Sequence, residues 1–261
     1  MKIATWNVNG IKARIDGVQT WLREYQPDIA CLQEIKSVDE AFPAEPFEAL
    51  GYNVVTHGQK GFNGVAIFSK IPFDDTHARL PGDDDDEQAR YLEATFSIKS
   101  GAIRVVCLYL PNGNPIDTSK FPYKLSCMDR LHDRVEELLR DEIPLVVAGD
   151  YNVIPHAIDC RRPEVWANDA LFQPQSRERY FKLLNLGLTD AVRTGHVGDD
   201  IYTFWDYQAG AWAKNNGIRI DHMLLSAQAT DKLIASGIDK DTRAWEKPSD
   251  HVPVWIEIDD E

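Results

Sequence analysis

The sequence has no long apolar run, no signal-peptide pattern and no cysteine pair at the spacing of a metal or redox motif. Without an apolar run of membrane-spanning length or a leader-like start, we expect a cytoplasmic protein with no membrane partner. Cys31, Cys107, Cys127 and Cys160 show no CxxC or Cys/His spacing. We therefore expect four free thiols and no zinc site.

Positive charge is also scarce, since 28 Lys and Arg face 42 Asp and Glu, for a net charge of −14. This balance at first argues against a nucleic-acid partner. The argument is weak, because exposed charges are screened beyond roughly 8 Å at physiological salt. Part of the acidity is one run, residues 83–87, which we expect to be a solvated loop and not a metal site. Global charge therefore leaves the partner open.

No low-complexity linker or repeat divides the chain, so we expect a single domain over residues 1–261. Apolar residues at helical spacing predict three helices, at 18–25, 125–139 and 176–184. Strand-like runs are more numerous, and their alternation is clearest at 252–258. Two segments are expected to be long structured loops, 112–123 and 155–173. Many strands with few helices predict an α/β fold in which two packed sheets are covered by helices.

Polar side chains stand where the strand-like runs end. They are Asn7, Glu34, Tyr109, Asp150 and Asn152, while Asp250 and His251 come just before the last run. In antiparallel or mixed sheets, the end of one strand lies beside the start of its neighbour, so we expect these groups to line one rim. Buried strands hold such side chains at fixed separations, as a metal site or a proton relay requires.

Four of the acids could act together: Glu34, Asp150, Asp221 and Asp250. Carboxylates gathered at one rim repel each other and persist only if a cation, a proton or hydrogen-bond donors compensate. Oxygen ligands with amides nearby favour magnesium, which suits phosphoryl chemistry. For each acid taken alone, the alternative is an ordinary turn or surface residue.

His251 adds a group that can accept a proton from water near neutral pH, provided that a partner fixes its tautomer. Asp221 is the candidate partner, because it lies in the strand-like run 219–225, where an unpaired charge is costly. His222 alternates to the opposite face and is interpreted as structural. The loop histidines are interpreted in the same way: His57, His77 and His196. Alone, His251 would more often be a turn histidine with its hydrogen bonds satisfied.

Asn7, Asn152 and Tyr109 complete a set that can handle phosphate, because amides and phenols orient a phosphodiester or donate to an oxygen that gains charge. Asn112 can support them. Its alternative role is a turn, since Asn-Gly is a common turn dipeptide.

These residues lie in segments that resemble the bacterial exonuclease III family of abasic-site endonucleases. The segments occur in family order over nearly the whole chain, at 6–14, 32–36, 109–113, 149–153, 219–226 and 249–253. Glu34 and the Ser-Asp-His motif alone mark only a wider superfamily of metal-dependent phosphodiesterases. More specific are the Asn-Gly-Ile-Lys-Ala-Arg start, the Tyr-Leu-Pro-Asn-Gly segment and residues 202–207.

The resemblance implies a four-layered αββα sandwich with the active site at the top of the two sheets. It implies magnesium, with manganese as a substitute, on Glu34, Asn7 and Asp250. It also implies the catalytic set Tyr109, Asp150, Asn152, Asp221 and His251. Either Asp150 or His251 would be the base, and one or two metal ions would act; the sequence leaves both choices open.

Specificity for a missing base needs a small apolar pocket that admits the extruded sugar. The family builds it near Phe204, Trp205, Ile218 and Ile220, although core packing is the alternative for Phe204 and Ile220. Ile218 stands where some relatives carry tryptophan. Residues expected to contact phosphate or DNA are Asn9, Lys36, Arg90, Asn112, Lys120 and Arg177. Further basic candidates are Lys124, Arg161, Arg162, Arg179 and Lys214, and each could equally be an ordinary surface charge.

The sequence thus predicts a monomeric, magnesium-dependent DNA repair nuclease that hydrolyses the phosphodiester 5′ to abasic sites in duplex DNA and leaves a 3′-hydroxyl. Exonuclease action from 3′ ends and removal of 3′ blocking groups are expected beside it. One alternative is a phosphodiesterase of the same superfamily acting on lipid or inositol phosphates. Another is a non-catalytic DNA-binding module on the same fold, which predicts loss of the acids or the histidine; none is missing.

Overall fold

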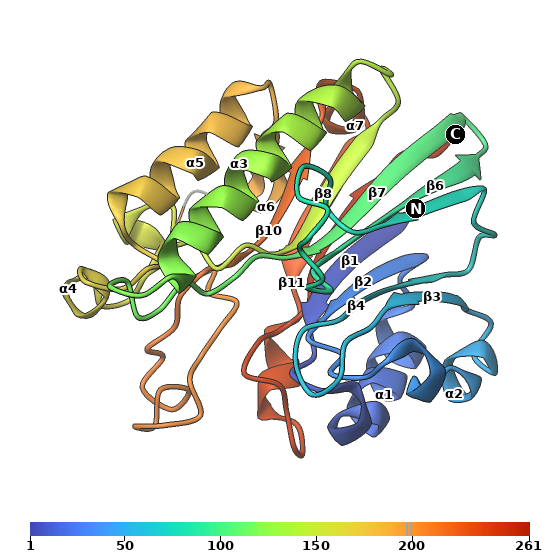
Figure 1. Ribbon diagram of the computed structural model, residues 1–261. Coiled ribbons are helices and arrows are strands. Elements are labelled where there is room, and N and C mark those ends of the chain that lie inside the picture. The colour runs from blue at the N-terminus through green and yellow to red at the C-terminus, as the bar shows by residue number, and fades with distance from the viewer. Residues whose placement is uncertain (197, 199) are drawn as a thin grey trace.

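A computed structural model describes residues 1–196, 198 and 200–261. Two mixed sheets of six strands each pack face to face, with helices on their outer sides (Figure 1). The first sheet has the order β11 (Leu233–Ile238), β12 (Val254–Ile258), β1 (Lys2–Asn7), β2 (Ile29–Gln33), β4 (Val65–Ser69), β3 (Asn53–His57). The second has the order β5 (Asp75–Ala78), β6 (Tyr91–Ile98), β7 (Gly101–Tyr109), β8 (Leu145–Asp150), β10 (Asp221–Leu225), β9 (Thr189–Asp190). The predicted α/β sandwich is confirmed.

Helices cover both outer faces. The first sheet carries α1 (Ile15–Tyr25) and α2 (Glu45–Glu48), and the second carries α3 (Lys120–Leu139) and α5 (Pro174–Asn185) (Figure 1). Shorter helices lie in the connections: α4 (Pro163–Trp166), α6 (Ala191–Gly195), α7 (Ala227–Thr230), η1 (Ile11–Ala13), η2 (Asp39–Ala41), η3 (Ala157–Asp159) and η4 (Lys240–Ala244). Within the described residues, no helix is long and apolar enough to cross a membrane.

The central strands are buried on both faces, which explains why their sequences read as continuous apolar runs. On β8, Val146 and Ala148 pack between the sheets, whereas Leu145 and Val147 pack under α3. The pairs β1–β2 and β7–β8 are parallel, and the other strand pairs are antiparallel. Strand ends at one edge of the molecule are therefore fixed by two layers of packing.

All three predicted helices are present, as α1, α3 and α5. Expected loops differ more: α3 begins at Lys120, inside segment 112–123, and segment 155–173 contains η3 and α4. His57 and His77 lie in strands, not in loops. The helices begin earlier than expected, because their first turns are exposed or only partly buried and so lie outside the apolar periodicity.

The acidic run 83–87 is not fully solvated, contrary to expectation. Asp86 accepts hydrogen bonds from Tyr123 Oη, at 3.0 Å, and from Arg130, so it fastens its loop to α3. The four cysteines are buried free thiols, as predicted.

A buried ionic network anchors the start of β10. Arg219 donates from Nε to Asp159, at 2.7 Å, and from Nη1 to Asp190, at 2.7 Å. The same nitrogen lies 2.9 Å from His222 Nδ1, and His222 Nε2 lies 2.9 Å from the Val153 carbonyl oxygen. An imidazole that accepts at Nδ1 and donates at Nε2 is neutral. The network thus joins segment 155–173 and β9 to the strand that carries Asp221.

We predict that His222 makes the fold acid-sensitive. Burial and the Arg219 charge lower its pKa to about 4. Below the ordinary pKa of histidine, the imidazole of His222 binds a proton in the unfolded chain but not in the folded protein. The free energy of unfolding therefore falls as the pH falls towards 4. The free energy of unfolding should drop by about 2 kcal/mol from this group between pH 7 and pH 5. Urea unfolding at both pH values measures the drop.

The matched control is His222→Gln, which keeps an acceptor and a donor without a titrating group. Its unfolding free energy should depend less on pH over this interval. Equal losses in the two proteins would contradict the assignment.

Candidate active site

Polar groups from both sheets meet at one rim. β1 ends at Asn7, β7 at Tyr109 and β8 at Asp150. Asp150 is in register with Tyr109 on the parallel strand and with Asp221 at the start of antiparallel β10. Glu34 follows the last residue of β2. The topology thus brings together residues that are distant in sequence, as expected from the ends of the apolar runs.

The Asn7 amide links two of the carboxylates. Its Nδ2 donates to Glu34 Oε1 and to Asp150 Oδ2, each at 3.0 Å. The side-chain oxygen of Asn7, Oδ1, accepts a hydrogen bond from the Asn9 backbone N–H at 3.0 Å. The Asn7 side chain therefore turns its nitrogen, not its oxygen, towards the two carboxylates. Two acids that would repel each other are thereby held through one shared donor.

Glu34 is held on both oxygens. Tyr109 Oη donates to Oε1 at 2.9 Å, and Lys36 Nζ lies 3.0 Å from Oε2. Burial opposes ionisation, but the Asn7 hydrogen bond and the Lys36 charge outweigh it and lower the pKa of Glu34 below its ordinary value. The carboxylate is therefore charged at neutral pH and suited to bind a cation.

The backbone is unusual at several of these positions. Asn9, Glu34, Lys36 and Asn152 all have left-handed conformations, with φ between 46° and 51°. Such conformations cost energy for residues other than glycine and persist where the surrounding structure enforces them.

His251 lies between two buried acids. Its Nδ1 is 2.9 Å from Asp221 Oδ2, and its Nε2 is 3.7 Å from Asp150 Oδ2. Burial alone would lower the pKa of His251, but Asp221 and Asp150 raise it to about 10. Burial also raises the pKa of Asp150 to about 7, although the His251 charge opposes this. Imidazole and carboxylates thus stabilise one another's charged forms.

This trio is also a possible metal-binding cluster, because one ligand atom of each residue lies within 4.8 Å of the others. Asp221 Oδ1 is buried with no hydrogen-bond partner among the described residues. Asp250 lies at the same rim: its Oδ1 accepts from Asn9 Nδ2 at 3.1 Å.

Two loops present amides beside Asp150. The Asn152 backbone N–H donates to Asp150 Oδ1 at 2.9 Å, and Asn152 Nδ2 donates to the Leu110 carbonyl oxygen at 2.9 Å. Asn112 Nδ2 lies 3.4 Å from Asn152 Oδ1. The Tyr-Leu-Pro-Asn-Gly and Gly-Asp-Tyr-Asn segments therefore form one polar surface.

The expected apolar pocket is only partly assembled. The Phe204 ring packs against the His251 ring with centroids 4.9 Å apart, and Ile218 and Ile220 share its apolar cluster. Trp205 belongs to a different cluster, with Tyr202, and is fully buried. The structure thus separates Trp205 from the other three.

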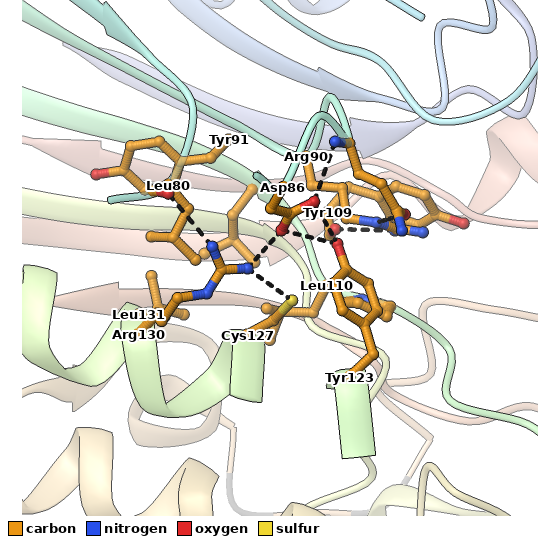
Figure 2. A pocket seen from close by; sticks show the side chains of 13 residues that line it. Leu80, Asp86, Arg90, Tyr91, Tyr109, Leu110, Tyr123, Cys127, Arg130 and Leu131 are labelled. Atoms are coloured by element: carbon orange, nitrogen blue, oxygen red, sulfur yellow. Dashed lines mark hydrogen bonds and ion pairs between the residues drawn. The ribbon is translucent and has the colours of Figure 1, made fainter. Parts of the chain in front are cut away.

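Basic residues differ in their access to the rim. Arg90 stacks on the Tyr109 ring at 4.8 Å and donates to the Tyr109 carbonyl oxygen at 3.2 Å. Figure 2 shows both residues beside a small crevice that Asp86 and Arg130 also line. Lys120 is exposed at the start of α3.

Other basic candidates have structural partners. Arg177 donates to the Pro155 carbonyl oxygen at 2.8 Å and stacks on Phe172, so it fastens α5 to the preceding loop. Arg162 pairs with Glu164, Arg179 with Asp129, and Lys214 with a backbone carbonyl, whereas Arg161 is exposed. Lys124 is buried, contrary to the expectation of a surface cation.

Sequence reasoning missed three supports of the rim. Ser249 Oγ donates to the backbone carbonyl oxygen of Asn7 at 2.7 Å, and Trp6 Nε1 donates to the backbone carbonyl oxygen of His251 at 3.1 Å. Thr203 Oγ1 accepts from the Asp221 backbone N–H at 3.2 Å. Ser249 could have been found, since it precedes Asp250 and His251 in one motif; the other two give no separate signal.

Comparison with known proteins gives concordant matches. The model of the Endonuclease/Exonuclease/phosphatase family matches residues 4–251. Exodeoxyribonuclease III of Haemophilus influenzae is 36% identical over 266 residues, covering 99% of this chain and 100% of that protein. The 3′ phosphatase NExo from Neisseria, solved with a product DNA hairpin, has a TM-score of 0.95 at 39% identity, covering 99% of each chain. An AP endonuclease from Archaeoglobus fulgidus has a TM-score of 0.93 at 38% identity, also covering 99% of each.

We predict that Asp221 sustains the charge on His251. In Asp221→Asn, the pKa of His251 should fall by roughly one unit or more, because a nearby negative charge is lost. NMR titration of the imidazole measures the pKa. The control is Asp250→Asn, which also removes a charge but leaves the hydrogen bond to Nδ1, and its effect should be smaller. Equal shifts would show that Asp221 has no special part.

Proposed function

Because the chain belongs to the endonuclease/exonuclease/phosphatase family, we propose that this DNA repair nuclease hydrolyses the phosphodiester 5′ to an abasic site in duplex DNA, leaving a 3′-hydroxyl. The observation that carries the proposal is the unbroken array of contacts from Glu34 through Asn7, Asp150 and His251 to Asp221. The similarity to an exodeoxyribonuclease, a 3′ phosphatase and an AP endonuclease supports exonuclease and 3′-end-cleaning activities beside it.

We propose magnesium as the cofactor, on Glu34 with Asn7 and Asp250, and manganese as its substitute. The donor set fits, since it offers two carboxylates and an amide, and hard oxygen ligands suit this ion. Asn7 would have to turn its amide, because its oxygen now faces Asn9. When bound, the ion would polarise a phosphate oxygen and steady the leaving oxygen. We favour Glu34 over the trio of Asp150, Asp221 and His251, because the two acids raise the pKa of His251 to about 10 and a protonated imidazole has no lone pair for an ion.

The remaining residues would hold the phosphate and the attacking water in place and would transfer the proton. Asp221 holds the ring of His251, whose Nε2 edge would face the phosphate and stabilise its negative charge. Asp150 would orient the attacking water and take its proton; His251 would be the base only in its neutral form, without its charge on the phosphate. Asn152, Asn112 and Tyr109 supply donors for phosphate oxygens.

Selection of a missing base would rest on Phe204, Ile218 and Ile220, whose apolar surface adjoins His251. A wall of this kind favours a bare sugar by size. Affinity would come from phosphate contacts. The proposed contact residues are Asn9, Lys36, Arg90, Asn112, Lys120 and Arg177.

We propose a monomer in which residues 1–261 form one catalytic domain, acting in the cytoplasm where chromosomal DNA would supply its substrate.

The decisive assay uses duplex DNA with one abasic analogue, enzyme and magnesium. We expect a single cut 5′ to the analogue that EDTA abolishes. Asp150→Asn and His251→Asn should each lose at least roughly 10³-fold in kcat, as expected for groups that act on the reacting atoms. His77→Asn and Asp75→Asn, on the exposed strand β5, are matched controls that should retain activity. Uncut DNA, or cleavage 3′ to the analogue that survives EDTA, would refute the proposal.

Glu34→Ala tests the metal ligand separately. We expect the magnesium concentration for half-maximal rate to rise at least roughly tenfold, because a charged ligand is lost. DNA affinity should not fall, since the same substitution frees Lys36 from its ion pair. Titrating magnesium against rate and DNA against fluorescence anisotropy gives both quantities. Glu40→Ala, at an exposed position, is the control, and coincident magnesium curves for wild type and Glu34→Ala would count against this site.

A further inference from the structure

Lys124 is a fully buried lysine on α3. Its Nζ donates to the Pro111 carbonyl oxygen at 2.9 Å and to the Asn152 carbonyl oxygen at 2.6 Å. Pro111 precedes Asn112, so both acceptors belong to segments that carry candidate phosphate-binding amides. One side chain therefore joins the two loops from below.

Burying an amine is costly unless hydrogen bonds compensate. Among residues 1–196, 198 and 200–261, no carboxylate forms an ion pair with Lys124, so its hydrogen bonds go to the two backbone carbonyls. Burial lowers its pKa to about 7, although Asp150 and Asp169 oppose this. Either protonation state keeps at least two N–H donors, enough for both carbonyls. Its contacts do not depend on its charge.

The loops also close around the lysine stem. Gly113 has φ of +91°, and a Cβ there would lie 2.7 Å from Lys124 Cδ. The two loops also contact each other directly. Asn152 Nδ2 donates to the Leu110 carbonyl oxygen, and Asn112 Nδ2 lies 3.4 Å from Asn152 Oδ1. The spacing between the two amides is thus set by a cluster with Lys124 at its base.

We propose that Lys124 is a positioning residue that fixes Asn112 and Asn152 as one phosphate-binding surface. The proposal rests on the proposed function of the rim. Lys124 lies behind both loops and touches no reacting atom in this scheme. Its loss would leave two buried carbonyls without their donor and let the loops separate.

A displacement of about 1 Å at catalytic groups can cost on the order of 10²-fold in rate. Lys124→Met keeps the length of the side chain and removes both donors. We expect kcat on abasic duplex to fall roughly 10²-fold while KM stays within about threefold, because the aligned donors matter most in the transition state. Lys124→Gln, which keeps two N–H donors on a shorter side chain, should lose less.

Lys120→Met provides the contrast, one turn earlier on the same helix and exposed. As a candidate phosphate contact, it should raise KM and weaken the dependence of KM on salt while kcat is largely kept. Melting temperatures of all variants are measured first, and kinetics are run well below the lowest. If Lys124→Met does not fold, the same comparison is made with Lys124→Gln.

A double-mutant cycle separates positioning from general stability. On a background that carries both Asn112→Ala and Asn152→Ala, Lys124→Met should add less than about threefold, because both amides through which it acts are already removed. Full multiplication of the two effects, an unchanged kcat, or a rise in KM alone would overturn the proposal. Absence of cleavage by the wild-type protein would instead overturn the proposed function, so the two failures can be told apart.

Discussion

The site depends on holding four carboxylates, two of them fully buried, together at one rim without a net repulsion that would open the fold. Asn7 donates to two of them at once, and His251 lies between Asp150 and Asp221. Each acid is thus stabilised by a donor or a positive charge that comes from a different strand or loop. Since both sheets contribute, the electrostatic arrangement also ties the two layers together. Fold and chemistry therefore share the same contacts.

Two neighbouring residues of β10 have different roles: Asp221 belongs to the candidate active site, and His222 belongs to the buried ionic network. Asp221 faces His251 at the rim, while His222 points to the other side of the sheet, towards Tyr151 and Tyr180. The alternation of a strand makes this possible. One imidazole is neutral beside an arginine, and the other is charged between acids, so position within the sheet alone decides the state of each ring.

Sequence was a good guide wherever burial left a periodic signal. The apolar runs located the central strands, and their polar ends located Glu34, Asp150 and the Ser-Asp-His segment. It was a poor guide where the outcome depended on tertiary neighbours. Lys124 lies on the same face of α3 as Met128 and Leu131, but a lysine there does not reveal what it bonds, and only the loops folded over it supply its two acceptors. Trp205 looks like a pocket residue, yet it packs with Tyr202 in a cluster separate from that of Phe204. Ion-pair and capping partners far apart in the chain leave no local pattern.

The left-handed backbone at Asn9, Glu34, Lys36 and Asn152 affects how substitutions there should be interpreted. A β-branched replacement would alter the path of the chain as well as delete a functional group, since such residues tolerate this conformation poorly. Loss of activity in a valine or isoleucine variant would then mix conformational with chemical damage. Asparagine, aspartate or glycine, which accept the conformation, would isolate the contribution of the side chain alone.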